Sequence, residues 1–357
     1  MGRDAGKRVV VIGAGIVGAS LAYHLARKGA EVIVVEAGAI ASGVTATSFA
    51  WINTAHSGPD PIPHLRSLAI DAYHRLETEL PDLQIRWTGA LSYSTSVSAT
   101  QQVSGSQSPG TLISRDQIRS LEPNLKNPPR HAVYKAEEGA LDAVQATHTL
   151  IAGAQAHGAK VLTQTRMLGF TTQDGQVTGV ETTAGSINAD VVVLAAGTGT
   201  STLTEMLGVS LPIEASPSIF IRYRSPPGLV NTIISSPAME VRQNAEGRLI
   251  AAEDFLDNTP ENQAEAIATR AAKAIQKELH GVTFIEPELA CVGLRPMPAD
   301  GIPIVGPLPN IRGVYVCAMH PGVILAAIVG RLASEEILGD QPVAALSSCR
   351  PQRFIQD

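Results

Sequence analysis

Aromatic residues account for only 4% of the 357-residue sequence, and cysteine occurs three times. Cys291, Cys317 and Cys349 cannot all pair with one another, and none of them has the C-x-x-C spacing of a metal or redox site. The sequence therefore predicts no metal centre and does not indicate a disulfide framework. A reducing compartment is the simpler interpretation, and we expect a cytoplasmic protein.

Basic runs and signal-peptide features are also lacking. The formal net charge is −6, which argues against a nucleic-acid partner because basic patches normally bind such partners. The apolar stretch from Val314 to Ala327 is short for a membrane span and is interrupted by His320, Pro321 and Gly322. We expect it to form a buried strand, a turn and the start of a helix, with no membrane span.

The remaining composition is that of an ordinary globular protein. Hydrophobic residues make up 44% of the chain and charged residues 17%, and alanine and glycine are abundant. This composition suits closely packed α/β structure, and a chain of 357 residues suits two domains.

The most informative segment is residues 8–36, which predict a strand, a glycine-rich turn, a helix, a second strand and a terminal acid. In this pattern Gly13 forms the tight turn, Gly15 lets the backbone approach a pyrophosphate, and Gly18 lets the helix pack closely on the sheet. The helix N-terminus offers free N–H groups to phosphates, and Glu36 can accept hydrogen bonds from ribose hydroxyls. The segment predicts a dinucleotide but does not by itself distinguish FAD from NAD.

Later segments predict two kinds of structure. Residues 37–48 form a loop of small and hydroxyl side chains, which could line a cofactor or simply connect two elements. The apolar run 189–194 leads into glycines, as in a central strand of a parallel sheet, whereas 211–290 resembles a more antiparallel module. We also expect helices at 64–79, 143–157, 261–280 and 324–338, and strands at 85–93, 161–163, 165–171, 177–182, 219–223, 239–242, 247–252 and 314–317.

Four separated segments occur in the order found in one enzyme family. They are Gly13-Ala14-Gly15-Ile16-Val17-Gly18 with Glu36, residues 191–199, Gly293-Leu294-Arg295-Pro296 with Asp300-Gly301, and residues 320–325. Together they resemble the FAD-dependent amine oxidoreductases of the D-amino-acid oxidase type, whose members include glycine oxidase and the sarcosine oxidase/dehydrogenase group. The likeness covers nearly the whole chain, and the Gly-Leu-Arg-Pro segment is more specific than the first motif.

The resemblance implies an α/β fold in which a Rossmann-like FAD/NAD(P)-binding domain is interleaved with an α+β substrate domain built on an antiparallel sheet. On this basis we assign 1–55, 140–210 and 291–357 to the FAD-binding domain. Residues 56–139 and 211–290 are assigned to the substrate domain.

The resemblance also implies which residues bind FAD. The first glycine turn would hold the pyrophosphate, Glu36 the adenosine ribose, and Met167 the adenine through its backbone. Backbone N–H groups at 322–325 would face the flavin pyrimidine, where a helix dipole stabilises the negative charge of reduced flavin. The implied cofactor-binding residues are Gly13, Ala14, Gly15, Ile16, Val17, Glu36, Ala37, Ser42, Thr45, Ala46, Thr47, Ser48, Met167, Ala196, Gly197, Gly322, Val323, Ile324 and Leu325.

One departure from the family concerns flavin attachment. In sarcosine oxidase relatives a cysteine just before the Gly-Leu-Arg-Pro segment tethers the flavin, but this position is Gly293 here. Cys291 lies two residues away, and we expect it to be a buried strand residue. FAD is therefore expected to be bound non-covalently.

Arg295 matches the arginine that pairs with the substrate carboxylate in glycine oxidase. A planar guanidinium binds a carboxylate bidentately, although a surface or domain-interface salt bridge is the alternative. Glu240 and Arg242 point to the same side of a predicted strand that borders the substrate in the family, so we assign them to substrate binding with Arg295.

His320, beside the flavin-contacting turn, is the second catalytic candidate after Arg295. His56 and Tyr93 also lie in segments that could face the flavin. For all of these polar residues the alternative is an ordinary position at a domain surface.

The implied reaction is hydride transfer from the carbon of a small amino acid or secondary amine to flavin N5, giving an imine that water hydrolyses. Such chemistry needs orientation and electrostatics but no acid–base pair. Oxygen or another electron acceptor would complete the cycle, and the chain could form homo-oligomers. The alternatives are a flavin-bearing subunit of a multi-subunit amine, opine or proline-type dehydrogenase, and a non-catalytic dinucleotide-binding protein.

Overall fold

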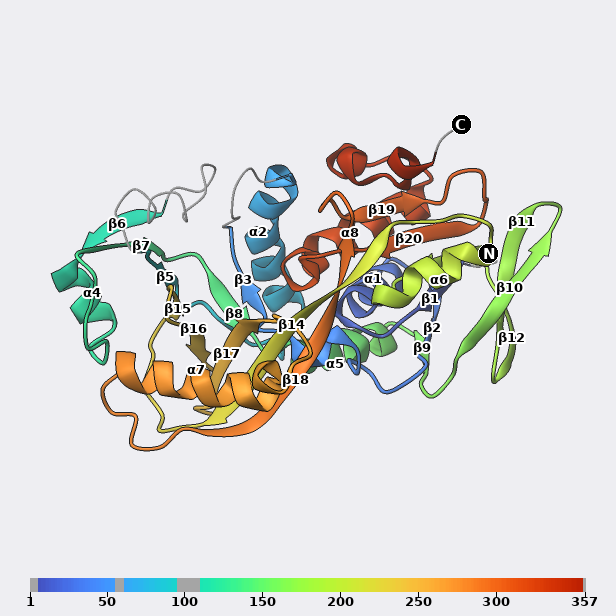
Figure 1. Cartoon of the computed structure of the whole chain (residues 1–357). Helices are drawn as coiled ribbons and strands as arrows, with labels where there is room; N and C mark the ends of the chain where they lie inside the picture. The colour runs from blue at the N-terminus through green and yellow to red at the C-terminus, as the bar shows by residue number, and fades with distance from the viewer. Residues whose placement is uncertain (1–5, 55–60, 95–109, 356–357) are drawn as a thin grey trace.

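The computed structural model describes residues 6–54, 61–94 and 110–355. Figure 1 shows a parallel sheet with its helices in one half of the molecule and a larger sheet with helix α7 in the other. Two predictions fall on residues outside the described ranges: the site candidate His56 and most of the surface segment at 98–111.

A six-stranded sheet forms the first half of the fold. Its first strand pairs in parallel with the second and with β13, because a dinucleotide motif joins its strands through a helix. Its central strands are apolar from Val9 to Ile12 and from Val191 to Leu194, since both of their faces are covered. In sheet order the strands are β19 (Ile304–Pro307), β20 (Val314–Ala318), β13 (Val191–Leu194), β1 (Arg8–Ile12), β2 (Glu31–Val35) and β9 (Lys160–Leu162), of which only β19 is antiparallel to its neighbour.

Helices cover one face of this sheet and a small hairpin sheet covers the other. Helix α1 (Ile16–Arg27) lies against α5 (Ala143–Ala156) and α8 (Gly322–Gly339). The contact between α1 and α8 is close, because a Cβ on Gly330 would lie 2.2 Å from the Oγ of Ser20. The hairpin sheet consists of β10 (Met167–Gln173), β11 (Gln176–Thr182) and β12 (Gly185–Asn188).

An eight-stranded, largely antiparallel sheet forms the second half. Helix α7 (Ala264–Glu278) packs on one face through an alanine- and isoleucine-rich stripe, and the other face turns toward the first half. In sheet order the strands are β18 (Glu286–Pro298), β14 (Ile213–Arg224), β17 (Leu249–Asp254), β16 (Glu240–Gln243), β15 (Ile233–Ser235), β5 (Ala90–Ser92), β7 (His131–Lys135) and β6 (Thr111–Ser114).

Shorter elements join the two halves. A three-stranded sheet lies between them, and helix α2 packs against α8. These elements are β3 (Trp51–Ile52), β8 (Gly139–Leu141), β4 (Ile85–Arg86), α2 (Pro63–Glu79), α4 (Arg115–Leu121), α6 (Thr200–Glu205) and the 3-10 segments η1 (Val44–Thr47), η2 (Gly197–Gly199), η3 (Pro260–Asn262), η4 (Ala344–Cys349) and η5 (Pro351–Phe354).

The predicted class is confirmed, and the expected helices at 64–79, 143–157 and 324–338 match α2, α5 and α8 to within two residues. The single strand expected at 85–93 is wrong. It divides into β4 and β5, which belong to different sheets, because Gly89 between them has a left-handed φ of 74°.

Strand β18 runs without a break across the predicted domain boundary between residues 290 and 291. It extends the substrate sheet as far as Pro298, so the Gly-Leu-Arg-Pro segment is part of that sheet. Cys291 lies on this strand but is only partly buried, in contrast to the expectation of a buried position. The assignment of segments to two domains stays a prediction.

Candidate functional site

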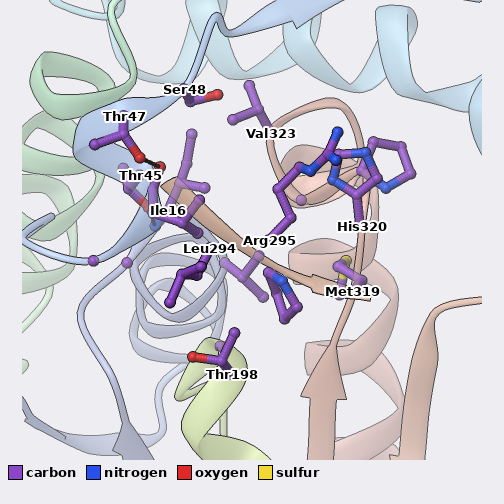
Figure 2. Close-up of a pocket in the computed structure, with 18 of the residues that line it drawn as sticks. Ile16, Thr45, Thr47, Ser48, Thr198, Leu294, Arg295, Met319, His320 and Val323 are labelled. Atoms are coloured by element: carbon purple, nitrogen blue, oxygen red, sulfur yellow. Dashed lines mark hydrogen bonds between the residues drawn. The ribbon is translucent and has the colours of Figure 1, made fainter. Parts of the chain in front are cut away.

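A cavity of about 1640 Å³ lies between the two halves of the molecule. Its walls come from the β1–α1 turn, the η1 loop, the turn before α8 and the inner face of the eight-stranded sheet. Figure 2 shows Thr45, Thr47 and Ser48 on one side of this space and Arg295 with His320 on another. Residues from opposite ends of the chain therefore form one site.

The glycine turn at the end of β1 is built for close backbone approach. Gly13 has a φ of 106°, and a Cβ there would lie 2.5 Å from the carbonyl oxygen of Ala195. A Cβ on Gly18 would lie 2.0 Å from the oxygen of Gly13. At Gly15, which lines the cavity, a Cβ would come within 3.2 Å of Thr45 Oγ1. Gly13 and Gly18 therefore allow the turn to pack against neighbouring backbone, and Gly15 keeps the cavity wall free of a side chain at the N-terminus of α1.

Glu36 lies at the end of β2, where the sequence predicts a ribose-binding acid. One carboxylate oxygen accepts the N–H of Ala14 and the other accepts the N–H of Gly38, each at 2.7 Å. These bonds fix the carboxylate at the cavity wall, where its remaining lone pairs can accept further donors. The adjoining Ala37 and the more distant Met167 also line the cavity.

The η1 loop brings hydroxyl groups to the glycine turn. Thr45 Oγ1 accepts the N–H of Ile16 at 3.1 Å, and Thr47 Oγ1 donates to the carbonyl of Val44 at 3.2 Å. A Cβ on Gly293 of β18 would lie 2.4 Å from Thr47 Oγ1. The missing side chain of Gly293 therefore allows β18 to approach this loop.

The N-terminus of α8 points into the same space. Gly322, Val323 and Ile324 line the cavity at the first turn of this helix of 18 residues. The buried Tyr73 of α2 donates its hydroxyl hydrogen to the carbonyl of Val323, and burial strongly raises the pKa of this phenol. A helix N-terminus held in this way favours a group that carries negative charge.

Arg295 extends from β18 into the cavity. Its guanidinium donates to Ser216 Oγ at 2.9 Å and to the carbonyl of Pro217 at 3.2 Å. Within residues 6–54, 61–94 and 110–355 no carboxylate forms an ion pair with it. The described residues therefore do not form the alternative salt bridge, and the positive charge of Arg295 faces the cavity.

His320 lies beside Arg295 in Figure 2. Burial, together with the positive charges of Arg295 and Arg66, lowers its pKa to about 4. The imidazole is therefore neutral at pH 7. It adds a polar group to the cavity but no charge.

Arg66 belongs to none of the sequence motifs, yet it lines the cavity from helix α2 and is only 4% exposed. Its Nη1 donates to Asn53 Oδ1, another cavity residue, at 3.3 Å. The sequence did contain a signal for Arg66, because position 66 falls on the buried stripe of the helix that also contains Leu65, Ala69 and Tyr73. An arginine on such a stripe needs a polar environment, which a cavity provides.

Glu240 also lines the cavity, whereas Arg242 does not. Arg242 is buried and donates to the carbonyls of Phe49 at 2.6 Å and Leu141 at 3.1 Å. Its guanidinium also lies 5.4 Å from the ring centroid of Phe49. These contacts disfavour the predicted role of Arg242 in substrate binding, because the hydrogen bonds of its guanidinium go to the backbone of the other half of the molecule.

Four further predicted residues have no direct place at the cavity wall. The N–H groups of Ala14, Ala46 and Leu325 donate to Glu36, Gly43 and Pro321 respectively, so they are already used within the protein. Tyr93 packs against the core between the eight-stranded sheet and α7. The other predicted cofactor residues border the cavity: Gly13, Gly15, Ile16, Val17, Glu36, Ala37, Ser42, Thr45, Thr47, Ser48, Met167, Ala196, Gly197, Gly322, Val323 and Ile324.

No group of three or more His, Cys, Asp or Glu side chains that could hold a metal ion occurs among the described residues. In the same part of the chain, no helix has the length and apolar character needed to cross a membrane.

Comparison with known proteins assigns the chain to a family. The model of the DAO family, described as FAD dependent oxidoreductase, matches residues 8–336. Glycine oxidase of Pseudomonas putida is 25% identical, with 94% of this chain and 96% of the relative covered. An opine oxidase subunit of Agrobacterium tumefaciens is 24% identical, with 97% of each chain covered.

Solved structures share the fold. L-proline dehydrogenase from P. horikoshii superimposes with a TM-score of 0.85 at 22% identity, covering 98% of each chain. Glycine oxidase from Bacillus cereus gives a TM-score of 0.83 at 23% identity, covering 96% of this chain and 98% of the other. The family match favours FAD over NAD and a redox enzyme over a non-catalytic binding protein. The chain belongs to the DAO family of FAD-dependent oxidoreductases.

Proposed function

We propose that this protein oxidises an amino acid or secondary amine that carries a carboxylate, at a CH–NH or CH–NH2 group. The observation that carries the proposal is Arg295, whose guanidinium faces the cavity without a carboxylate partner among the described residues. A carboxylate bound there would gain a charge-assisted, bidentate hydrogen bond. The names of relatives such as glycine oxidase agree with this class of substrate.

The residues present fit FAD. The glycine turn leaves room that a Cβ would fill, and the helix N-termini of α1 and α8 both open on the cavity. We assign the pyrophosphate to Gly15 and Val17, which line the cavity at the start of α1, the ribose to Glu36 and the flavin pyrimidine to Gly322 and Val323. When bound, FAD supplies the electron acceptor for the hydride that leaves the substrate carbon.

Non-covalent binding of FAD is supported by the close contact at Gly293. A side chain at this position would overlap Thr47, so the strand carries no nucleophile where related enzymes place their tethering cysteine. Cys291 is partly buried on the same strand, and burial raises the pKa of its thiol, which disfavours the reactive thiolate.

The chain's own residues then bind and orient. Arg295 holds the carboxylate. The neighbouring imidazole of His320 is neutral, so it does not repel the guanidinium of Arg295. Arg66 adds positive potential to the same wall. Orientation of this kind places the reacting C–H bond and lowers the entropic part of the barrier.

A second candidate is a flavin-bearing subunit of an amine-oxidising complex. It is favoured by the full-length match to the Agrobacterium tumefaciens relative, whose name makes it one subunit of an opine oxidase. Turnover by the purified chain alone, with oxygen or an artificial acceptor, would argue against this candidate.

The first experiment records the absorbance spectrum of the purified protein before and after acid precipitation. Flavin in the supernatant supports non-covalent FAD, whereas a yellow pellet would contradict it. Anaerobic bleaching by a panel of amines with and without a carboxylate then tests the substrate class.

The second experiment tests Arg295. We expect Arg295→Ala to raise KM for carboxylated amines by roughly 100-fold, because a hydrogen-bonded charge pair contributes about 3 kcal/mol, while FAD stays bound. Arg295→Lys should recover only part of the loss, since it cannot bind bidentately. An unchanged KM in Arg295→Ala would remove this residue from the carboxylate role.

A further inference from the structure

The eight-stranded sheet places Arg295 and Glu240 on the same face. Arg295 of β18 pairs with Ser216 of β14, and Phe220, four residues along β14, pairs with Ala252 of β17. Continuing the pairing of Val241 with Ala251 places Glu240 opposite Ala252. Since side chains alternate along strands, Arg295, Phe220, Ala252 and Glu240 share the face that borders the cavity.

The two charged side chains are too far apart to bind one small group. Strands β14 and β17 lie between β18 and β16, so β18 and β16 are separated by about 14 Å across the sheet. Positions 295 and 240 are also offset by the four residues from Ser216 to Phe220, or about 13 Å, along the strands. A ligand that contacts both must be extended. The cavity of about 1640 Å³ has room for such a ligand beside a cofactor.

The surroundings of Glu240 are acidic and offer little compensation. Its carboxylate accepts only a long hydrogen bond, from Ser235 Oγ at 3.4 Å, among the described residues. Burial raises the pKa of Glu240 to about 7, and the negative charges of Glu253 and Asp254 on β17 contribute to this rise. Arg242 on the same strand cannot neutralise Glu240, because its donors bind the carbonyls of Phe49 and Leu141.

We infer that the substrate carries a second cationic group, an ammonium or guanidinium, which Glu240 binds while Arg295 holds the carboxylate. This inference rests on the proposed oxidation of a carboxylated amine and narrows it to basic, extended amino acids or N-substituted amino acids. A cation at this position pairs with a carboxylate that the protein leaves without an ionic partner in the part of the chain described. Glu240 is thus assigned as the specificity-determining residue.

The test compares ligands that differ only in this charge. Arginine and citrulline have nearly the same shape, and lysine and norleucine differ by the terminal ammonium; both enantiomers of each are used. With the FAD-loaded wild type, we expect kcat/KM for flavin reduction to be about 10- to 100-fold higher for the cationic member, as expected for a charge-assisted hydrogen bond. Ligand-induced shifts in melting temperature measure binding separately from turnover.

Glu240→Gln should abolish this preference, so that within the variant kcat/KM for arginine equals that for citrulline and kcat/KM for lysine equals that for norleucine. Glu265→Gln removes the same charge from the exposed surface of α7 and should retain the preference. Loss of the preference in both variants would indicate a general electrostatic effect and overturn the assignment of Glu240.

The outcomes separate the inference from the proposed function. Oxidation of neutral and cationic amines at equal rates would keep the oxidation and overturn the inference. Preferential binding of arginine without flavin reduction would keep the inference and overturn the oxidation of that compound. Binding of neither arginine nor lysine would overturn the inference.

Discussion

At the scale of single residues, Glu240 is the clearest case of a destabilised charge. Its pKa is raised from 4.5 to about 7, mainly because burial disfavours the charged form. The folded protein therefore binds the Glu240 proton more tightly than the unfolded chain does. The stability contribution of this group is present below about pH 4.5 and is lost as the pH rises through about 7.

In the Glu240→Gln variant the side chain at this position cannot ionise, so this loss of folding stability at high pH should disappear. We expect the FAD-free variant to equal the wild type near pH 4.5 and to exceed its free energy of unfolding near pH 8 by at most about 3 kcal/mol. Urea unfolding at both pH values measures the difference. An equal gain at both pH values would mean that packing, not ionisation, is responsible.

The residues of the site fall into two groups: those predicted by sequence motifs and those brought to the site by the packing of the fold. Gly13, Glu36 and Gly322 belong to short motifs whose spacing along the chain is characteristic of dinucleotide binding, so the sequence itself carries the signal for their proposed roles. Arg66 and the actual contacts of Arg242 depend on which surfaces meet when two halves of the fold pack. The buried stripe of α2 marks Arg66 as unusual, but no local pattern encodes which surfaces these arginines meet.

At the scale of elements, β18 is the strand that local rules would miss. It contains Pro287, Pro296 and Pro298, which normally argue against a strand. The strand lies at the edge of its sheet, where proline's missing N–H group need not leave a ladder bond unmade. The sequence identified this segment by its motif, while its length as a strand depended on an edge position known only from the fold.

The contact of β18 with the η1 loop can be tested at Gly293. We expect Gly293→Ala to weaken FAD binding by about tenfold, because the added Cβ would lie 2.4 Å from Thr47 Oγ1 and the loop must shift. Titration of the FAD-free protein, followed by flavin fluorescence, gives the dissociation constant. In a Thr47→Ala background the same substitution should have a smaller effect. Equal effects in both backgrounds would show that these two positions do not interact.

At the scale of the whole molecule, Arg242 joins the two halves. It comes from the eight-stranded sheet and donates to Phe49, which follows η1, and to Leu141 of β8. The cavity lies between these parts, so its shape depends on how they are held together.

Replacing Arg242 should therefore affect stability and cofactor binding together. We expect Arg242→Gln to lower the free energy of unfolding by about 2–4 kcal/mol, because buried carbonyls lose their donors, and to weaken FAD binding. Arg242→Lys, which keeps a charged donor, should recover part of both losses. Thermal unfolding with and without FAD is the measurement. If Arg242→Gln raised KM without changing stability or FAD binding, the result would instead support the predicted role of Arg242 in substrate binding.

The pairing of the first strand with distant segments has a consequence for how the protein is made. β1 pairs with β13, β20 completes the parallel sheet next to β13, and α1 packs against α8. A ribosome must therefore synthesise the chain past Ile324 before the phosphate turn near the start meets the rest of its cavity. Such long-range closure is slow compared with local folding. Cofactor loading consequently has to wait for synthesis through Ile324, and a chain stalled before β20 would contain the nucleotide motif without the rest of the cavity wall.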